Sequence, residues 1–327
     1  MDDIRWFAPN DFGRQVVPRL RALGWSIATE GLAPARVAFA MSQTSAVEAF
    51  RYAHRHRASL VVYVWDLPPW RVGNGLPDHV FAVGGRLLRV PRLRGRFLTG
   101  RGQQSRLFWV ARHAKSVWAP SRQSREDIVR HIGVEATQVE YCYDSDSFLR
   151  GAAPPAAAHP ALLSVSRLVP YKNQAAVIRV AARFTRPMHV RLVGSGPEHD
   201  HLAGLARELG VTCSIESNLS TGALVSAYRS AAVVVCPSRF EGFGLSPIEG
   251  IACGAPVAAS DIPPHREFLG AAVEYFPLDD DAGLEAAVRR ALDRGAPDSA
   301  GIARLTLDAA AARFDAALRA LSGHPVR

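Results

Sequence analysis

Two glutamates lie seven residues apart in a glycine-rich stretch, residues 239–254, which reads RFEGFGLSPIEGIACG and contains Glu241 and Glu249. An apolar run at 232–236 precedes the stretch and a helical pattern follows at 246–253, so we predict a strand, a glycine-rich turn and a helix N-terminus. Such a turn directs free backbone N–H groups and the positive end of a helix toward one point, which suits a phosphate. A neighbouring carboxylate can accept hydrogen bonds from sugar hydroxyls.

Two interpretations fit the second glutamate. In the structural one, Ser246, Pro247 and Glu249 occupy the N-cap, N1 and N3 positions of a helix, and Ser-x-x-Glu is a capping box. In the functional one, Glu249 accepts hydrogen bonds from a sugar. Glu241 lies in a loop where no structural role is evident, which favours a chemical role.

A basic motif follows another predicted strand. Residues 164–173 read SVSRLVPYKN after the strand candidate at 161–165, so Arg167 and Lys172 lie at the same sheet edge as Glu241. Cations at a helix N-terminus oppose the macrodipole, and a bound anion removes that conflict. Two cations beside a diphosphate neutralise the charge that grows as it departs, which is work that a metal performs elsewhere.

Together these motifs resemble those of retaining glycosyltransferases of the GT-B fold, in the large family 4, or glycosyltransferase group 1. Residues 241–254 resemble the family's E-x7-E signature, and residues 166–173 resemble its Gly-Arg-x4-Lys-Asn pattern, with Ser166 in place of Gly. The resemblance runs from about residue 116 to the C-terminus and is strongest over 162–262. It implies transfer of a sugar from a nucleotide-diphosphate sugar with retention at the anomeric carbon.

The resemblance also implies a role for each donor-site residue. Glu241 is the catalytic carboxylate beside the transferred sugar, Glu249 binds the ribose, and Arg167 with Lys172 binds the diphosphate. Further donor contacts are implied for Gly194, Gly196, Phe243, Gly244, Leu245 and Ser246. No Asp-x-Asp motif lies near these residues, and the acidic run 279–281 fits the N-terminus of the following helix better than a metal site. We therefore predict no metal and no cofactor besides the co-substrate.

Acceptor-side candidates lie in the first half of the chain. Residues 60–65 are a β-branched strand candidate, and Asp66 follows at the strand end where open α/β sheets bind ligands. Family members often carry His-Asp here, whereas this chain has Trp65-Asp66, so an acceptor-side or catalytic role falls to Asp66 without the His. A turn-initiating Asp explains Asp66 as well. Gly13, after the first predicted strand at 4–8, is either an acceptor-side contact or a plain turn glycine.

The predicted elements define an α/β fold with two domains. A chain of 327 residues suits two domains of about 150 residues each. Residues 151–160 form a Pro/Ala linker, so we place an acceptor-side Rossmann-like domain at 1–150 and a nucleotide-sugar-binding Rossmann-like domain at 161–327. Alternating strands and helices predict doubly wound parallel sheets. The resemblance implies GT-B architecture with an interdomain cleft and a final helix, within 300–321, that crosses back to the first domain.

One basic block accounts for the net charge of +9. Nine Arg and Lys residues and no Asp or Glu lie between Arg86 and Lys115, interleaved with apolar residues that include Leu107, Phe108 and Trp109. This mixture is typical of an interfacial segment, so we predict peripheral binding to an anionic membrane surface. A basic cleft for a soluble anionic acceptor is the alternative.

Composition also bears on location. No apolar run reaches the roughly 18 residues of a spanning helix, and the acidic start differs from a signal peptide, which predicts a cytoplasmic protein. The chain has four cysteines without Cys-x-x-Cys spacing, which predicts buried thiols rather than zinc or disulfides.

We therefore predict a retaining, metal-independent glycosyltransferase that moves a sugar to a glycan, lipid-linked or small-molecule hydroxyl. Three alternatives remain. A nucleotide-sugar epimerase on the same fold would not depend on an acceptor for nucleotide release. A nucleotide-sugar-binding protein without catalysis is consistent with the missing His before Asp66. A nucleic-acid binder using the basic block ranks last, because the block has no recognised motif beyond charge.

Overall fold

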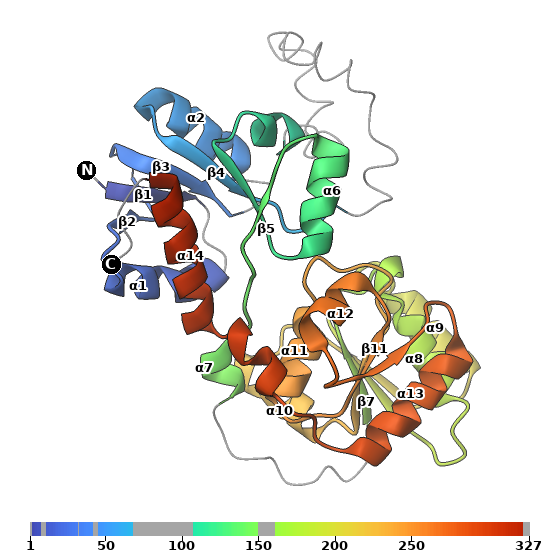
Figure 1. The fold of residues 1–327 in the computed structure, drawn as a ribbon. Coiled ribbons are helices and arrows are strands. Elements are labelled where there is room, and N and C mark those ends of the chain that lie inside the picture. Colours follow the sequence, from blue (N-terminus) through green and yellow to red (C-terminus); the bar gives the residue numbers. More distant parts are fainter. Residues whose placement is uncertain are drawn as a thin grey trace, which may run out of the picture. The chain divides into compact units, whose positions relative to one another are not determined.

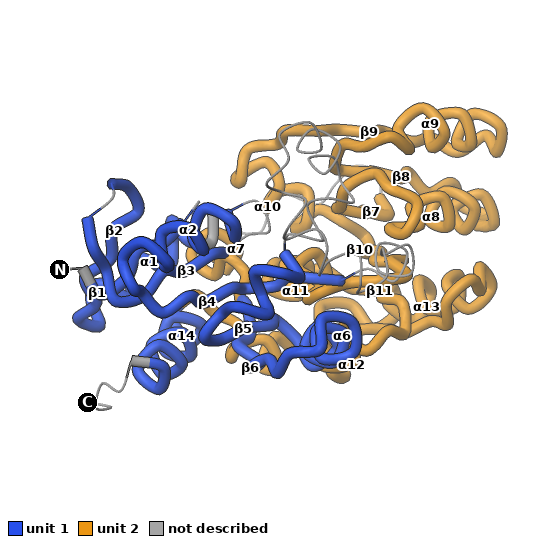
Figure 2. The backbone as a smooth tube through the Cα atoms, turned by 90° about the horizontal axis from the view of Figure 1, so that it is seen from above, with its two compact units in different colours: residues 1–141, 308–327 blue, residues 142–307 orange. Residues whose placement is uncertain are grey.

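The computed structural model describes residues 2–7, 11–31, 33–41, 45–67, 107–149 and 161–322. The chain divides into two compact units, which Figure 2 distinguishes by colour. Unit 1 is Met1–Tyr141 with Asp308–Arg327, and unit 2 is Cys142–Leu307. Within the described residues, each unit contains a six-stranded parallel sheet, which confirms the predicted α/β fold of two Rossmann-like domains.

The sheet of unit 1 has the strand order β2-β1-β3-β4-β5-β6. Its strands are β1 (Asp2–Phe7), β2 (Ile27–Ala28), β3 (Ala35–Ala40), β4 (Ser59–Tyr63), β5 (Ser116–Ala119) and β6 (Thr137–Gln138), and its helices are α1 (Asp11–Ala22), α2 (Ala46–His56), a helical segment at 107–112, α6 (Arg122–Ile132) and α14 (Leu307–Ser322). The central strands are apolar on both faces, which is typical of a parallel sheet covered by helices on both sides.

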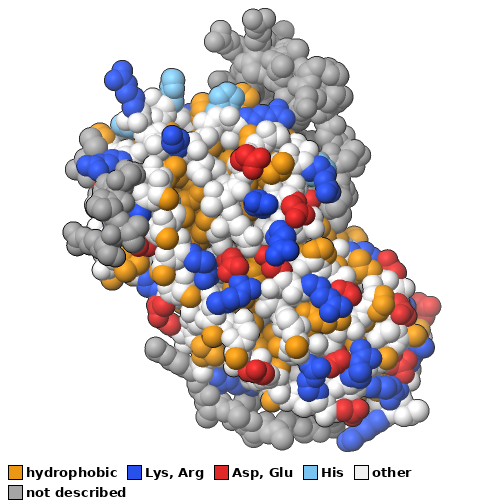
Figure 3. Space-filling view, viewed as in Figure 1, with side chains coloured by type: hydrophobic (Ala, Val, Ile, Leu, Met, Phe, Trp, Pro, Cys, Tyr) orange, Lys and Arg blue, Asp and Glu red, His pale blue; other side chains and the backbone are white. Residues whose placement is uncertain are grey.

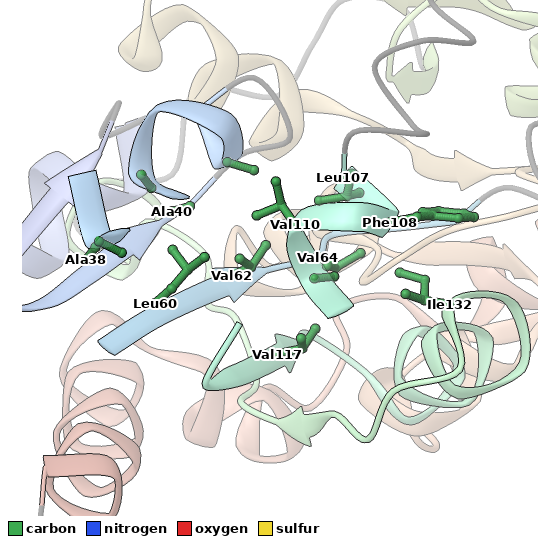
Figure 4. Close-up of a cluster of buried hydrophobic side chains, with 14 of the residues drawn as sticks. Ala38, Ala40, Leu60, Val62, Val64, Leu107, Phe108, Val110, Val117 and Ile132 are labelled. Atoms are coloured by element: carbon green, nitrogen blue, oxygen red, sulfur yellow. The ribbon is translucent and has the colours of Figure 1, made fainter. Parts of the chain in front are cut away.

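Alternation along these strands separates two core layers of unit 1. On one face, Leu60 and Val62 pack with side chains from α2 and from the 107–112 helix (Figure 4). On the other face, Phe314 of α14 packs its ring within 6.3 Å of the rings of four aromatic residues, Trp6, Phe39, Tyr63 and Trp118. The final helix therefore supplies one aromatic side of the core of unit 1.

The sheet of unit 2 has the order β12-β11-β10-β7-β8-β9. Its strands are β7 (Ala161–Val165), β8 (His189–Val193), β9 (Cys213–Glu216), β10 (Val233–Cys236), β11 (Val257–Ser260) and β12 (Glu274–Phe276). Its helices, several of which carry labels in Figure 1, are α7 (Ser145–Phe148), η2 (Pro170–Lys172), α8 (Gln174–Ala181), α9 (His199–Glu208), α10 (Thr221–Ser230), α11 (Leu245–Ala252), α12 (Pro263–Leu269), α13 (Asp281–Arg294) and η3 (Ala300–Leu305). The strand order reverses between β7 and β10, which makes this pair the topological switch point where open α/β sheets bind ligands.

The division between the units falls between Tyr141 and Cys142, ahead of the linker predicted at 151–160, which lies outside the described residues. The reason lies in α7, whose Phe148 ring packs 5.8 Å from the ring of Tyr228 in α10. The segment before the predicted linker is therefore part of unit 2.

Charges on the surface of unit 2 are mixed. On the face drawn in Figure 3, Lys and Arg side chains lie beside Asp and Glu side chains over much of this unit. Ion pairs account for part of this pattern, for example Arg266 with Asp261 at 2.6 Å and Arg290 with Glu274 at 2.7 Å. The excess of positive charge belongs to the block at 86–115 instead.

Candidate active site

The switch point of unit 2 brings the two chemical motifs together. Strands β7 and β10 are hydrogen-bonded neighbours, with Leu162 opposite Val233, so the loops that follow them emerge side by side. Lys172 from the first loop and Glu241 from the second form an ion pair, with Nζ 2.5 Å from Oε1. Only 12% of the lysine side chain and 16% of the glutamate side chain is exposed. The two predicted site residues therefore meet in a largely buried contact.

The surroundings of Glu241 keep its carboxylate ionised. Burial opposes ionisation, but the positive charge of Lys172 and its hydrogen bond to the carboxylate outweigh it and hold the pKa of Glu241 below its ordinary value. His265 is fully buried, and its Nδ1 lies 2.8 Å from the carbonyl oxygen of Ser260, to which it donates in the Nδ1–H tautomer. Burial lowers the pKa of His265, so the imidazole is neutral at neutral pH.

Gly244 shapes the turn between Glu241 and helix α11. It is the N-cap residue and has a φ of 92°, a left-handed conformation that favours glycine. A Cβ at this position would lie 3.1 Å from Cδ2 of His265, so a side chain would also be crowded. No side chain caps α11, and the first amide groups of a helix have no acceptor within the helix. The N-terminus of α11 therefore offers N–H groups to an anion.

The capping-box interpretation of Glu249 is wrong. The helix starts at Leu245 with Gly244 as its cap, so Ser246 is already the second helical residue. The Tyr228 hydroxyl instead donates to Oε2 of Glu249 at 2.8 Å and lies 3.1 Å from Oγ of Ser246. The pKa of Glu249 is raised to about 7, because burial and, to a smaller extent, the negative charge of Asp144 outweigh the Tyr228 hydrogen bond, which lowers it.

Arg167 is an exposed cation on the loop after β7. Its Nη2 lies 2.5 Å from the hydroxyl of Tyr171, and it forms no ion pair with any carboxylate in the part of the chain that the structure describes. Its charge is thus available to a ligand, in contrast to that of Lys172, which Glu241 already balances.

The glycine turn after β8 is pressed against this loop. A Cβ on Gly194 would lie 1.9 Å from the carbonyl oxygen of Ser166, and one on Gly196 would lie 2.2 Å from that of Leu168. The Leu168 amide donates to the carbonyl of Ser195 at 2.9 Å. Both glycines are therefore required for the close approach of two backbones, and this approach positions the loop that carries Arg167.

Phe243 belongs to the turn and has a structural contact of its own. Its side chain is buried and its ring packs 4.4 Å from that of Phe268. Only its backbone remains for the predicted donor contact. Leu245 and Ser246, the other two predicted contacts of the turn, are the first two residues of α11, which places their amides in its first turn.

The acceptor-side candidates belong to unit 1. Asp66 follows β4 near the predicted strand end, and the preceding Trp65 is anchored, because its Nε1 donates to the carbonyl of Met41 at 2.6 Å. Trp65 thus has a structural contact at the position where the resemblance expects a His. Gly13 was predicted in a turn before the first helix, but α1 already begins at Asp11, so Gly13 is a buried helical residue.

The structure adds two residues that the sequence motifs did not identify, Tyr228 and His265. The signal of Tyr228 is weak: it is a tyrosine in an apolar helical stretch, and its hydroxyl would need a hydrogen-bond partner if it were buried. His265 stands in an ordinary helix-start pattern, Pro-Pro-His-Arg, and nothing in its neighbours along the chain relates it to Glu241.

The acidic run 279–281 is occupied by structural contacts. Asp280 caps α13, while Asp279 pairs with Arg239 and Asp281 with Arg179. Among the described residues, no three His, Cys, Asp or Glu side chains are grouped so as to hold a metal ion.

Most of the basic block, residues 86–106, lies outside the described residues. Within the described end of the block, Leu107 and Phe108 are buried in the core of unit 1 (Figure 4), so their predicted place in an interfacial segment is wrong. Trp109 is 37% exposed. No described helix is both long enough and apolar enough to cross a membrane.

Two parallel sheets of this order, with the site at a switch point, define a protein of the GT-B fold. The fold matches a glycosyltransferase from Rickettsia africae with a TM-score of 0.67 and 12% identity, over 99% of both chains. It also matches HepE from Anabaena in complex with UDP and glucose, with a TM-score of 0.66 and 14% identity, over 99% of this chain and 98% of HepE.

Sequence comparison also finds glycosyltransferases, and the family match falls within unit 2. Residues 149–300 match the family described as "Glycosyl transferases group 1". A D-inositol 3-phosphate glycosyltransferase from Acidothermus cellulolyticus is 36% identical over 116 residues, which is 31% of this chain and 26% of that protein. A second one from Catenulispora acidiphila is 32% identical over 170 residues, 44% of this chain and 39% of that protein. The matches thus span well under half the length of these relatives.

Proposed function

We propose that the chain is a retaining, metal-independent glycosyltransferase of family 4 that transfers a sugar from a nucleotide-diphosphate sugar to a hydroxyl of a glycan, lipid-linked or small-molecule acceptor. The observation that carries the proposal is the arrangement at the switch point of unit 2. There, Glu241 pairs with Lys172 in the turn that leads into the uncapped N-terminus of α11. The loop of Lys172 also carries Arg167, which forms no ion pair among the described residues. The family match over 149–300 supports the reaction class.

The donor class follows from the chemistry of the site. Cations and helix amides suit a diphosphate, while two carboxylates, Glu241 and Glu249, suit the hydroxyls of a sugar and a ribose. The likeness to HepE, which was solved with UDP and glucose, supports a nucleotide sugar as the co-substrate. In this proposal Arg167, Lys172 and the amides of Gly244 to Ser246 hold the diphosphate.

The proposed step conserves the anomeric configuration. The acceptor oxygen bonds to the anomeric carbon on the face from which the diphosphate departs, and the bond between that carbon and the phosphate oxygen breaks. Both electrons of the broken bond go to the phosphate oxygen, which then receives the acceptor proton. Arg167, Lys172 and the N-terminus of α11 stabilise the negative charge that develops there.

Nucleotide binding is the first test. A thermal-shift panel with UDP-, GDP- and ADP-sugars should identify one base, because a ligand at a hundred times its Kd adds about 2.7 kcal/mol of stability. Transfer from that donor should then continue in excess EDTA and keep the anomeric configuration of the donor. Activity that EDTA abolishes and manganese restores, or an inverted product, contradicts the proposal.

A nucleotide-sugar-binding protein without transfer is the second candidate. The observation that favours it is Trp65, which is anchored to Met41 at the position before Asp66 where the resemblance expects a His. Steady turnover that releases nucleotide only in the presence of an acceptor excludes this candidate, and it excludes an epimerase as well.

We further propose that the enzyme works in the cytoplasm at an anionic membrane surface, through the basic residues between Arg86 and Lys115. Each cation near such a surface contributes about 1 kcal/mol, so half of the nine give roughly 4 kcal/mol. Sedimentation with phosphatidylglycerol vesicles tests this, and binding should be lost at high salt and on changing Arg89, Arg92, Arg94 and Arg96 to Ser. The proposal of membrane binding is contradicted if the protein sediments equally with neutral and with phosphatidylglycerol vesicles, or if it sediments with neither.

A further inference from the structure

Tyr228 connects the helix before β10 to the candidate ribose-binding carboxylate. It lies near the end of α10, its side chain is 0% exposed, and its hydroxyl donates to Oε2 of Glu249 at 2.8 Å. Helices α7, α10 and α11 contact one another, and their labels lie together in Figure 1. The ring of Phe148 from α7 packs against that of Tyr228. The tyrosine is therefore held from two sides and has little freedom to move.

This contact leaves the two carboxylate oxygens of Glu249 unequal. Oε2 accepts the Tyr228 hydrogen bond, whereas Oε1 has no hydrogen-bond partner among the residues that the structure describes. An ionised carboxylate can accept about four hydrogen bonds, so Oε1 retains acceptor capacity for the adjacent hydroxyls of a ribose.

We propose that Tyr228 is a positioning residue for the donor, which holds Glu249 by Oε2 so that Oε1 receives the ribose hydroxyls. The inference rests on the proposed function, because it takes Glu249 to be the ribose-binding group. It adds a residue that lies outside the two sequence motifs. The buried hydroxyl of Tyr228 donates to one carboxylate oxygen and leaves the other to the ligand.

The electrostatics of the site support this role. The groups that act directly on Glu249 are Tyr228 on α10 and Asp144 ahead of α7. Two cations lie one contact further away, because Arg229 on α10 acts on Cys253 and Lys172 acts on Cys236. Burial raises the pKa of Glu249 to about 7, and the Tyr228 hydrogen bond is the contact that opposes this rise. Loss of the hydroxyl therefore raises the pKa further, so the carboxyl is protonated over more of the neutral range and accepts fewer hydrogen bonds.

The test compares nucleotides with and without ribose hydroxyls. Calorimetry with UDP, GDP and ADP on the full chain selects the nucleotide that binds most tightly, and its 2′,3′-dideoxy form is the second probe. Tyr228→Phe keeps the ring and removes the hydroxyl. We expect about tenfold weaker binding of the ribonucleotide at pH 7, no change for the dideoxy form, and a binding midpoint that moves to higher pH than in the wild type. In turnover, the donor KM should rise while kcat stays the same.

A matched control is Tyr63→Phe, which removes a buried hydroxyl that donates to Val139 in unit 1 and should leave both probes unaffected. An equal loss for both probes, or an unmoved pH midpoint in Tyr228→Phe, overturns the inference. If Tyr228→Phe does not fold, the pH dependence of binding to the wild-type protein is measured instead. Affinity for the ribonucleotide must fall as pH drops through about 7, whereas affinity for the dideoxy form must not. The same pH profile for both nucleotides overturns the inference.

Glu249→Gln separates this inference from the proposed function. If this variant leaves ribonucleotide affinity unchanged, the ribose role of Glu249 itself fails. If it weakens the ribonucleotide but Tyr228→Phe does not, only the role of Tyr228 fails.

Discussion

Replacing Lys172 by Met removes the cation of a largely buried ion pair. The two side chains are 12% and 16% exposed, and Nζ lies 2.5 Å from Oε1 of Glu241. Removing one partner of a buried pair leaves the other charge uncompensated, which costs about 3 to 5 kcal/mol. Because both side chains keep some contact with solvent, we expect the lower figure, about 3 kcal/mol, for unit 2 at neutral pH.

The stability lost in Lys172→Met depends on pH, and the Lys172–Glu241 ion pair sets the direction of that dependence. In the wild type, burial opposes ionisation but Lys172 holds the pKa of Glu241 below its unfolded value of 4.5. The contribution of the pair is therefore present above that pH and is lost as pH falls through the folded-state pKa. In Lys172→Met, burial dominates and raises the pKa of Glu241, so the carboxyl takes up a proton in the folded state below neutrality. The difference in stability between the two proteins is thus largest near neutral pH and narrows toward about pH 4.

The assay must follow unit 2 by itself. All six tryptophans of the chain lie at or before Trp118, so intrinsic fluorescence reports on unit 1. Hydrogen exchange of the β7 and β10 amides across a urea series measures the free energy of unfolding of unit 2 instead. A loss under about 1 kcal/mol, or an equal loss at about pH 7.5 and about pH 4.5, refutes the reasoning.

Two further variants sharpen the measurement. Arg266→Met breaks the pair with Asp261, whose side chains are 55% and 41% exposed, and should cost less than about 1 kcal/mol. The double variant Lys172→Met, Glu241→Gln should recover most of the stability lost in the single variant, because it leaves no buried charge without a partner.

Three other outcomes are expected. Gly244→Ala should lower the stability of unit 2 by about 1 to 3 kcal/mol and abolish nucleotide-induced thermal shifts, because the added Cβ crowds His265 at a residue in the left-handed conformation. The control is Gly222→Ala, whose added Cβ would have no atom within 4 Å and which should cause neither effect. In steady-state kinetics Glu241→Gln should lower kcat more than it raises the donor KM, while Glu249→Gln should mainly raise KM; the reverse pattern would exchange their roles. Single-turnover transfer followed by NMR of the anomeric proton should show the donor configuration in the product with and without EDTA, and a mixture of anomers would count against retention.

The sheets were predictable because their strands are short apolar runs separated by helical patterns. The meeting of the Lys172 and Glu241 loops was predictable for a topological reason, since strands of a parallel sheet present their C-terminal ends at one edge. The ion pair between Lys172 and Glu241 could not be predicted, because it depends on side-chain packing between residues that are 69 positions apart.

The errors have local physical causes. Ser246 and Gly244 both suit the start of a helix, and only the backbone conformation shows that the chain enters α11 through the glycine. Leu107 and Phe108 stand among arginines, and an amphipathic pattern does not distinguish a face that packs on a protein core from one that enters lipid. Tyr228 and His265 act on the glutamates from other elements, α10 and α12, so no motif around Glu241 or Glu249 contains them.

The return of α14 to unit 1 affects the order in which the protein forms during synthesis. Unit 2 is continuous in the chain, whereas unit 1 is discontinuous and lacks Phe314 until its last segment is made. Because domains fold as units as they emerge from the ribosome, unit 2 can be complete while the aromatic rings of Trp6, Phe39 and Trp118 still have no helix to cover them. A nascent chain that stalls after Leu307 therefore presents a finished unit 2 joined to an open aromatic surface, which is the kind of surface that chaperones bind and that promotes aggregation.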